Sequence, residues 1–192
     1  MSEPLVSTHL GKSAAAVRGR SEVVWVDGPD AVSFLDGLLS QNIASMEPGT
    51  VAPSLLLAPN GKLRATLTVL RGTDRVGLVC DAGSGQTVAG DLGRFKIRVD
   101  ATIAVDDREV WEVWSDVSDV PGWVPARGHW KQDDDGVVVA DLPLARATMH
   151  RSVLIGASPE IDSVSVAKIE PLRIEAGEPV MGIDLSDSTI PQ

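Results

Sequence analysis

Residues 53–80 hold the feature that most constrains the fold: three strand-like runs separated by two turn signals. In the second run, Lys62–Leu70, apolar side chains alternate with polar ones, which is typical of a strand with one buried face. Asn60-Gly61 before it indicates a hairpin, because Asn and Gly accept the positive φ values of a tight turn. Arg71–Asp74 supplies the second turn signal. The sequence therefore predicts an antiparallel meander with one buried face.

Helical patterns interrupt the strands on both sides of this meander. Apolar residues recur three and four apart in the segments 31–39, 84–95 and 162–174. The remaining strand-like runs are 22–27, 102–105, 110–115, 137–140 and 151–155. Strands and helices do not alternate regularly as in a doubly wound sheet, so the fold class predicted is α+β.

Composition and charge exclude several classes of protein. The chain has 192 residues and a net charge of −10, which argues against a general nucleic-acid binder. Cys80 is the single cysteine and the three histidines are scattered, so we expect no metal site. No run reaches the length of a membrane span, and the first twenty residues lack the apolar region of a signal peptide. We expect a cytoplasmic protein.

A short segment near the end of the chain combines charge with a stop signal. Leu172 and Ile174 are expected to point inward, while Arg173 and Glu175 carry opposite charges and Gly177 ends the element. Such a carboxylate can accept two N–H bonds from the edge of an amino-pyrimidine ring. The alternative interpretation is an ordinary helix C-terminus with an exposed ion pair.

Two other patterns also allow two interpretations. The cations Arg94, Lys96 and Arg98 surround apolar residues, which indicates either a solvated helix end with an edge strand or a landing place for an anionic ligand. Four of the five tryptophans lie between Trp111 and Trp130. They indicate a core or domain interface, or else a surface that binds a partner protein.

Four segments together carry a resemblance that extends from about Glu22 onward. They are Val26–Ala31 with Phe34-Leu35 and Leu39–Asn42, Leu57–Lys62, Leu92–Val99, and Arg173–Gly177 with Pro179 and Pro191-Gln192. In this order and spacing the chain resembles the folate-binding YgfZ-type proteins, which are relatives of the aminomethyltransferase (T-protein) of glycine cleavage.

The resemblance implies two interleaved α+β units with antiparallel sheets. The expected units are residues 1–50 with 137–192, and residues 51–136, the second of them ferredoxin-like. The family's C-terminal barrel is expected to be missing from the 192 residues. The family binds a tetrahydrofolate in a central opening, so a tetrahydrofolate or a one-carbon derivative is the expected cofactor.

The site residues implied are carried over one by one. Glu175 matches the glutamate that binds the pterin ring, and a carboxylate suits the ring N–H and exocyclic amine as a bidentate acceptor. Arg173 is expected to orient this segment. Asp81, just after a strand that the family places near the pterin, is a further candidate.

Two departures from the family pattern bear on function. The T-protein carries an Asp-Asp pair where this chain has Ala65 and Thr66, and neither can act as a carboxylate base. The YgfZ-type Lys-Gly-Cys signature would follow Gln192, where the chain stops, and Cys80 lies in a predicted strand and cannot replace it. Either this chain is a piece of a longer protein or it is a reduced family member, and we expect the first.

The resemblance implies a tetrahydrofolate-binding accessory protein without classical turnover. Its expected role is the assembly or repair of iron–sulfur clusters and the maintenance of enzymes that carry them, including some that modify tRNA, with such enzymes as possible partners. One alternative is a folate-dependent one-carbon transferase related to aminomethyltransferase. Another is a ligand-free interaction module that uses its tryptophan-rich segment.

Overall fold

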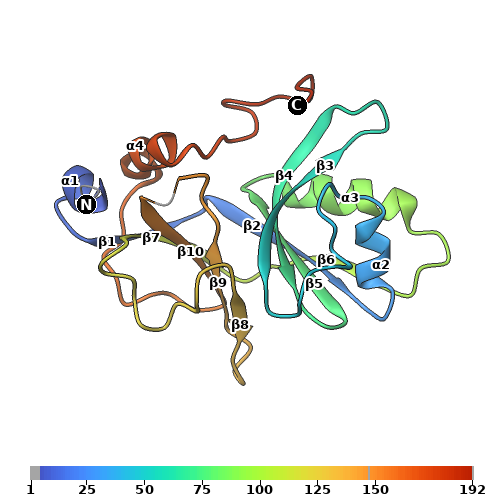
Figure 1. Cartoon of the computed structure of the whole chain (residues 1–192), viewed down its shortest axis with the longest axis horizontal. Coiled ribbons are helices and arrows are strands. Elements are labelled where there is room, and N and C mark those ends of the chain that lie inside the picture. Colours follow the sequence, from blue (N-terminus) through green and yellow to red (C-terminus); the bar gives the residue numbers. More distant parts are fainter. Residues whose placement is uncertain (1–4, 147, 192) are drawn as a thin grey trace. The chain divides into compact units, whose positions relative to one another are not determined.

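The computed structural model describes residues 5–146 and 148–191. Along these residues the elements are α1 (Leu5–Leu10), β1 (Ala14–Arg18), β2 (Ser21–Asp27), α2 (Ala31–Asp36), β3 (Val51–Leu57), β4 (Leu63–Arg71), β5 (Arg75–Asp81), α3 (Gly85–Phe95), β6 (Thr102–Val105), β7 (Val110–Asp116), β8 (Trp130–Gln132), β9 (Val138–Leu142), β10 (Met149–Ile155) and α4 (Val166–Ala176) (Figure 1). The strands form two antiparallel five-stranded sheets, which confirms the predicted α+β class. No helix in this described part is long and apolar enough to cross a membrane.

The chain divides into two compact units, each made of two separate stretches of sequence. Unit 1 comprises the described residues before Glu22 together with Arg108–Pro179. Unit 2 comprises Glu22–Asp107 together with the described residues from Val180 onward. In the part of the chain that the structure describes, each unit contains one sheet and two helices.

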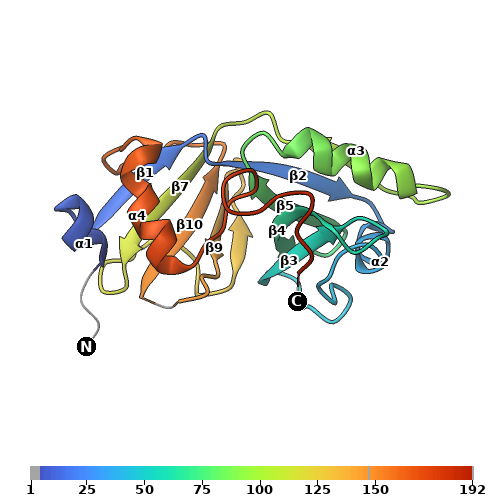
Figure 2. The ribbon, with the colours of Figure 1, turned by 90° about the horizontal axis from the view of Figure 1, so that it is seen from above.

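Unit 1 is a sheet with the strand order β1-β7-β10-β9-β8, in which each neighbouring pair is antiparallel. Alternate residues of β7 share a face of the sheet, so Glu112, Trp114 and Asp116 point the same way. Helices α1 and α4 lie over the sheet on the Trp114 side (Figure 2). The core there consists of Val6, Val17, Trp114, Met149, Ile169, Leu172 and Ala176. Trp114 is therefore a core residue, one of the two roles expected for the tryptophans.

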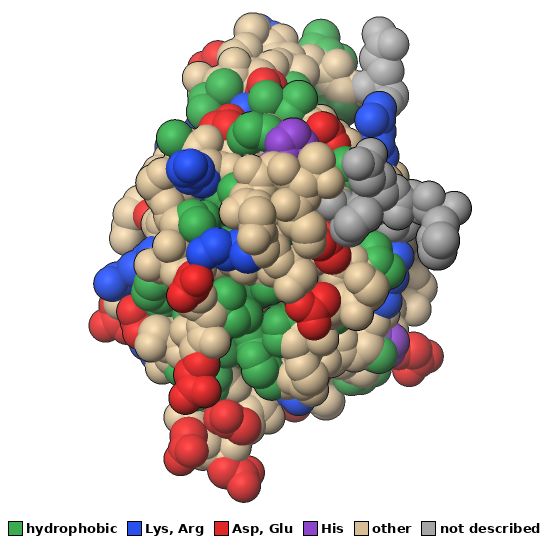
Figure 3. All heavy atoms as spheres, turned by 90° about the vertical axis from the view of Figure 1, so that its left-hand side faces the viewer, with side chains coloured by type: hydrophobic (Ala, Val, Ile, Leu, Met, Phe, Trp, Pro, Cys, Tyr) green, Lys and Arg blue, Asp and Glu red, His purple; other side chains and the backbone are tan. Residues whose placement is uncertain are grey.

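The β8–β9 hairpin of unit 1 carries the most acidic turn of the chain. Asp133, Asp134 and Asp135 are exposed at its tip, and the backbone N–H of Val137 donates to the Asp133 carboxylate at 2.8 Å. In Figure 3, acidic side chains gather at the lower end of the molecule, which is where the β8–β9 hairpin ends in Figure 1. A surface of this charge repels a phosphate backbone.

Unit 2 contains the predicted meander as β3, β4 and β5 within the strand order β3-β4-β5-β2-β6. The expectation of a single buried face is wrong for β4, where Thr68 and Leu70 are buried as well as Val69. The Trp25 indole of β2 packs beside Leu70 and Gly77 and so helps to bury the second face of β4. A Cβ on Gly77 would lie 2.7 Å from the indole ring, so glycine leaves the room that Trp25 needs.

The hairpin between β3 and β4 forms where the Asn-Gly signal predicts it. Gly61 has the expected positive φ of 79°, and its N–H donates to the Ala58 carbonyl at 2.8 Å. Asn60 does not share the positive φ. The left-handed residue is thus the glycine that closes the turn, as in longer hairpin loops.

Three predicted elements differ from those in the structure. Helix α2 stops at Asp36 with Gly37 as its cap, and Leu39 bridges Leu56 of β3 instead of continuing the helix. The edge strand that was one interpretation of the segment around Lys96 does not form within the described residues, while β6 occupies Thr102–Val105 as predicted.

The third is α4, which begins at Val166 and not near Asp162. Residues 162–164 run beside Ala16 of β1. The Ala16 N–H donates to the Asp162 carbonyl at 3.0 Å, and the Val164 N–H donates to the Ala16 carbonyl at 2.8 Å. Backbone groups that pair with a strand in this way cannot start a helix.

The observed unit boundaries differ from the expected ones. Residues 22–50 belong to unit 2, because β2 pairs with β6 and because Leu35 and Ile43 lie in the core that β4 and β5 line. Residues 110–136 belong to unit 1, because β7 pairs with β1 and β10. Both units are discontinuous in sequence.

Candidate functional site

The end of α4 in unit 1 displays the candidate carboxylate. Gly177 follows the helix with φ 75° and ψ 29°, a left-handed conformation that favours glycine. The Gly177 N–H donates to the Ile174 carbonyl at 3.1 Å, and the Glu178 N–H donates to the Arg173 carbonyl at 2.9 Å. This pair of bonds is a Schellman cap. The predicted stop at Gly177 is confirmed, and Glu175 lies in the last helical turn.

Glu175 combines a fixed backbone with an accessible side chain. Its side chain is 41% exposed, and Oε1 lies 2.9 Å from His9 Nε2 of α1. The Arg146 guanidinium donates to the Glu175 backbone carbonyl at 3.4 Å. A carboxylate offers about four acceptor positions, so one histidine contact leaves others for the N–H groups of a ligand.

Arg173 lies two residues earlier and has a different role. The residue is only 4% exposed, and its Nε and Nη2 both donate to Glu170 Oε2 at 2.8 Å. Its Nη1 donates to the Glu178 carbonyl at 3.1 Å. These contacts hold the end of α4, and whether Arg173 orients this segment toward a ligand stays a prediction.

The hydrogen bond from Arg173 lowers the pKa of the Glu170 carboxyl, and Arg20 adds to the effect against the opposing influence of burial. Arg20 Nη1 donates to the other oxygen, Glu170 Oε1, at 2.9 Å. Glu170 is therefore held as a carboxylate between two guanidinium groups. It links α4 to the turn that follows β1.

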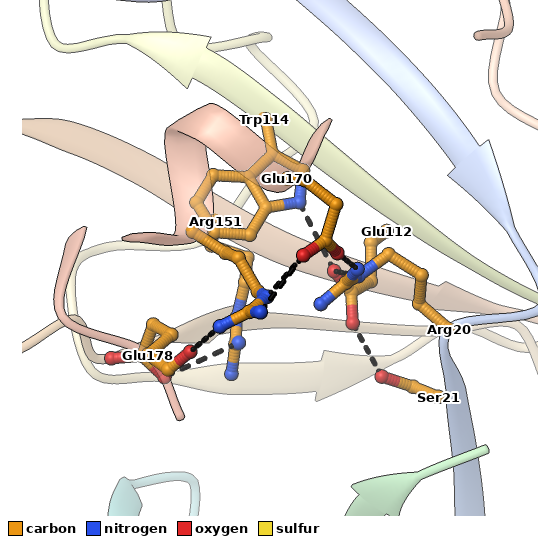
Figure 4. Close-up of polar contacts among 8 residues, drawn as sticks. Arg20, Ser21, Glu112, Trp114, Arg151, Glu170 and Glu178 are labelled. Atoms are coloured by element: carbon orange, nitrogen blue, oxygen red, sulfur yellow. Dashed lines mark hydrogen bonds and ion pairs between the residues drawn. The ribbon is translucent and has the colours of Figure 1, made fainter. Parts of the chain in front are cut away.

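The chain of contacts continues to β7 and β10, as Figure 4 shows. Arg20 Nε lies 3.5 Å from Glu112 Oε2, and the Glu112 carboxylate also accepts from Ser21 Oγ at 2.5 Å and Trp114 Nε1 at 3.0 Å. Just after the end of α4, Glu178 Oε2 lies 3.3 Å from Arg151 Nη1 of β10.

The three arginines of this network are matched by three glutamates, so it carries no net charge that would call for an ionic ligand. We interpret it as support for α4. Sequence reasoning missed Arg20, Glu112, Arg151, Glu170 and Glu178 because they are spread over about 160 positions and share no local motif.

Asp81 belongs to unit 2 and is the last residue of β5. Its Oδ2 accepts from the Met181 N–H at 3.0 Å and from Thr66 Oγ1 at 3.4 Å. Asp81 thus fastens the segment after Pro179 to the sheet of unit 2. The structure brings Arg173 and Glu175 together on one helix, while Asp81 lies in the other unit.

The positions aligned with the family's Asp-Asp pair also lie in unit 2. Ala65 is buried in the core, and the Thr66 hydroxyl bonds to Asp81. In the described part of the chain, no three His, Cys, Asp or Glu side chains gather to form a metal-binding group. Cys80 is buried, and desolvation, followed by the nearby charges of Glu22 and Asp81, raises the pKa of its thiol to about 12.

Comparisons with known proteins bear on the fold. No family model and no curated protein matches the chain. Among solved structures, the glycine cleavage system aminomethyltransferase T from Bartonella henselae is similar, with a TM-score of 0.83 and 18% sequence identity. The match covers 98% of this chain and 58% of that one, so the chain spans little more than half of the enzyme's length. The chain has the fold of the corresponding part of that aminomethyltransferase.

Proposed function

We propose that this protein binds a reduced folate, with Glu175 as the group that accepts the pterin's N–H donors. The observation that carries the proposal is an accessible carboxylate in a capped last helical turn, in a chain whose fold is that of an aminomethyltransferase T. A pterin presents a ring N–H and an exocyclic amine side by side, and one carboxylate can accept from both.

The surroundings of Glu175 support a binding role. The Schellman cap and the ion pair of the buried Arg173 with the half-buried Glu170 fix the backbone that carries it. A group whose support is rigid loses less entropy when a ligand binds. Arg173 is assigned to that support, and Asp81, which belongs to unit 2, stays a separate prediction that the site around Glu175 does not use.

The test is a calorimetric titration of the 192-residue chain with tetrahydrofolate and with air-stable 5-formyltetrahydrofolate. Glu175→Gln removes the charge and turns an amide donor toward the pterin's donors, so we expect affinity to fall about ten- to a hundredfold. A hydrogen bond to a charged group contributes about 1.5–3 kcal/mol. Glu160→Gln makes the same charge change at an exposed position of unit 1 and should leave affinity unchanged.

Equal affinities for wild type and Glu175→Gln would remove Glu175 from the site. No binding of either folate, with an unchanged melting temperature at high folate, would favour the ligand-free interaction module. A ligand that binds only the native state must raise that temperature.

We further propose that folate binding serves the assembly or repair of iron–sulfur clusters, as the resemblance to YgfZ-type proteins implies. Depletion of the protein in its source cell should lower the activity of iron–sulfur enzymes, and the wild-type gene should restore it while the Glu175→Gln gene does not. Unchanged enzyme activities on depletion would refute this role and leave folate binding standing.

One-carbon transfer is the second candidate, and the likeness to an aminomethyltransferase T favours it. The buried methyl group of Ala65 and the hydroxyl of Thr66 oppose it, because neither can take a proton as a carboxylate base does. We therefore expect no methylenetetrahydrofolate from a carrier-bound aminomethyl group, and its formation in that assay would reverse the order of the two candidates.

A further inference from the structure

His9 of α1 makes a side-chain contact with the Glu175 carboxylate. Its Nε2 lies 2.9 Å from Glu175 Oε1, and the two side chains are 29% and 41% exposed. Both residues belong to unit 1. The contact is thus partly open to solvent.

The position of His9 is set by buried contacts and does not depend on its bond to Glu175. The Asp116 carboxylate, which is nearly inaccessible, accepts from the Val6 N–H at 2.9 Å, the Ser7 N–H at 3.1 Å and the Ser7 hydroxyl. A six-residue helix has little stability of its own, so this anchor matters. Val6 packs in the same core cluster as Leu172 and Ala176 of α4. Helix α1 therefore presents the imidazole to α4 from a fixed place.

A glutamate in the last turn of a helix has three rotatable side-chain bonds, and without a partner it samples many rotamers. Ordering such a side chain when a ligand binds costs affinity. A fixed donor on one oxygen reduces this cost and leaves the other acceptor positions open.

We infer that His9 is a positioning residue for folate binding: its Nε2–H donates to Glu175 Oε1 and orients the carboxylate toward the pterin. This inference rests on the proposed function. The opposite hypothesis is that His9 competes with the ligand for the Glu175 carboxylate. Removal of the imidazole would weaken folate binding under the positioning hypothesis and strengthen it under the competition hypothesis.

The experiment is the same titration with 5-formyltetrahydrofolate, applied to substitutions of His9 that differ in where they place a donor. Gln sets its amide N–H at the reach of Nε2, whereas Asn sets it at the reach of Nδ1, too short for Glu175. His9→Ala and His9→Asn should weaken binding roughly five- to twentyfold, the effect of leaving one long side chain unrestrained. His9→Gln should stay within about twofold of wild type, because it restores the donor.

Lys12→Ala is the matched control, since it removes another ion pair of unit 1, Lys12 with Asp162 at 2.8 Å. It should leave affinity unchanged. If substitution of His9 acted by a general loosening of α1, His9→Gln and His9→Asn would lower folate affinity equally. An equal loss of affinity in these two variants would therefore overturn the inference. Tighter binding by His9→Ala would also overturn it and would identify His9 as a competitor.

The two proposals fail in different ways. If Glu175→Gln weakens binding while His9→Ala and His9→Asn do not, positioning by His9 is wrong and the folate site stands. If Glu175→Gln has no effect, the proposed site itself is wrong, and the inference about His9 falls with it.

Discussion

Arg173 and Glu175 lie two residues apart in sequence yet have opposite surroundings. Two residues of an α-helix are separated by about 200° around its axis, so one side chain faces the sheet and the other faces away. Arg173 is buried and pairs with Glu170, while Glu175 stays accessible. In the Arg-x-Glu motif, Arg173 therefore supports the helix end while Glu175 stays accessible to a ligand. This explains why the motif indicates both an ion pair and a ligand site.

Cys80 shows the effect of burial on a single group. Because the pKa of its thiol is raised from its ordinary value of about 9 to about 12, the folded state keeps the proton that the unfolded state loses between these values. The unfolded chain then binds fewer protons, so stability falls with rising pH in this window, by about 1.4 kcal/mol between pH 9.5 and pH 10.5.

Urea unfolding of wild type and Cys80→Ala from pH 8 to pH 11 tests this expectation. The wild type should lose more stability than the variant above pH 9, while below pH 9 the difference between them should be constant. Parallel curves across the whole range would mean that the thiol ionises as easily in the folded state as in the unfolded one.

At the scale of elements, α4 shows what periodicity can and cannot predict. Its existence and its end at Gly177 follow from local signals, but the segment expected to open the helix pairs with β1. Ile174 was expected to point inward with Leu172 and is instead 63% exposed. Pro171 lies inside the helix, although a helix interior disfavours proline. Burial of Ile169 and Leu172 on either side of it stabilises the helix, a tertiary effect that no local pattern contains.

The same helix supplies a matched pair of substitutions. Leu172 is fully buried against the core of unit 1, so Leu172→Ala should destabilise the protein by about 2–5 kcal/mol. Ile174→Ala removes an equally large but exposed side chain and should change stability by less than about 0.5 kcal/mol. Denaturant unfolding measures both, and comparable losses would mean that the face of α4 is wrongly assigned.

At the scale of the whole molecule, the strand pairings decide what local patterns cannot. The runs 14–18 and 110–116 are nearly a hundred residues apart, yet they pair as β1 and β7 and place Arg20 beside Glu112. An isolated strand pattern does not say which sheet it joins. The strand-like runs from residue 22 onward and the turn at Gly61 were predictable, whereas β1 and β8 were not predicted. The unit boundaries and the supporting network could not be predicted, since both depend on contacts between distant segments.

The central claim is that Glu175 receives the pterin ring, and a crystal structure of the chain with bound 5-formyltetrahydrofolate tests it most directly. We predict the ring N–H and the exocyclic amine at about 2.7–3.2 Å from the Glu175 oxygens, with His9 still on Oε1. A folate bound with its pterin away from Glu175, or a Glu175 carboxylate that contacts only His9 in the complex, would contradict the account.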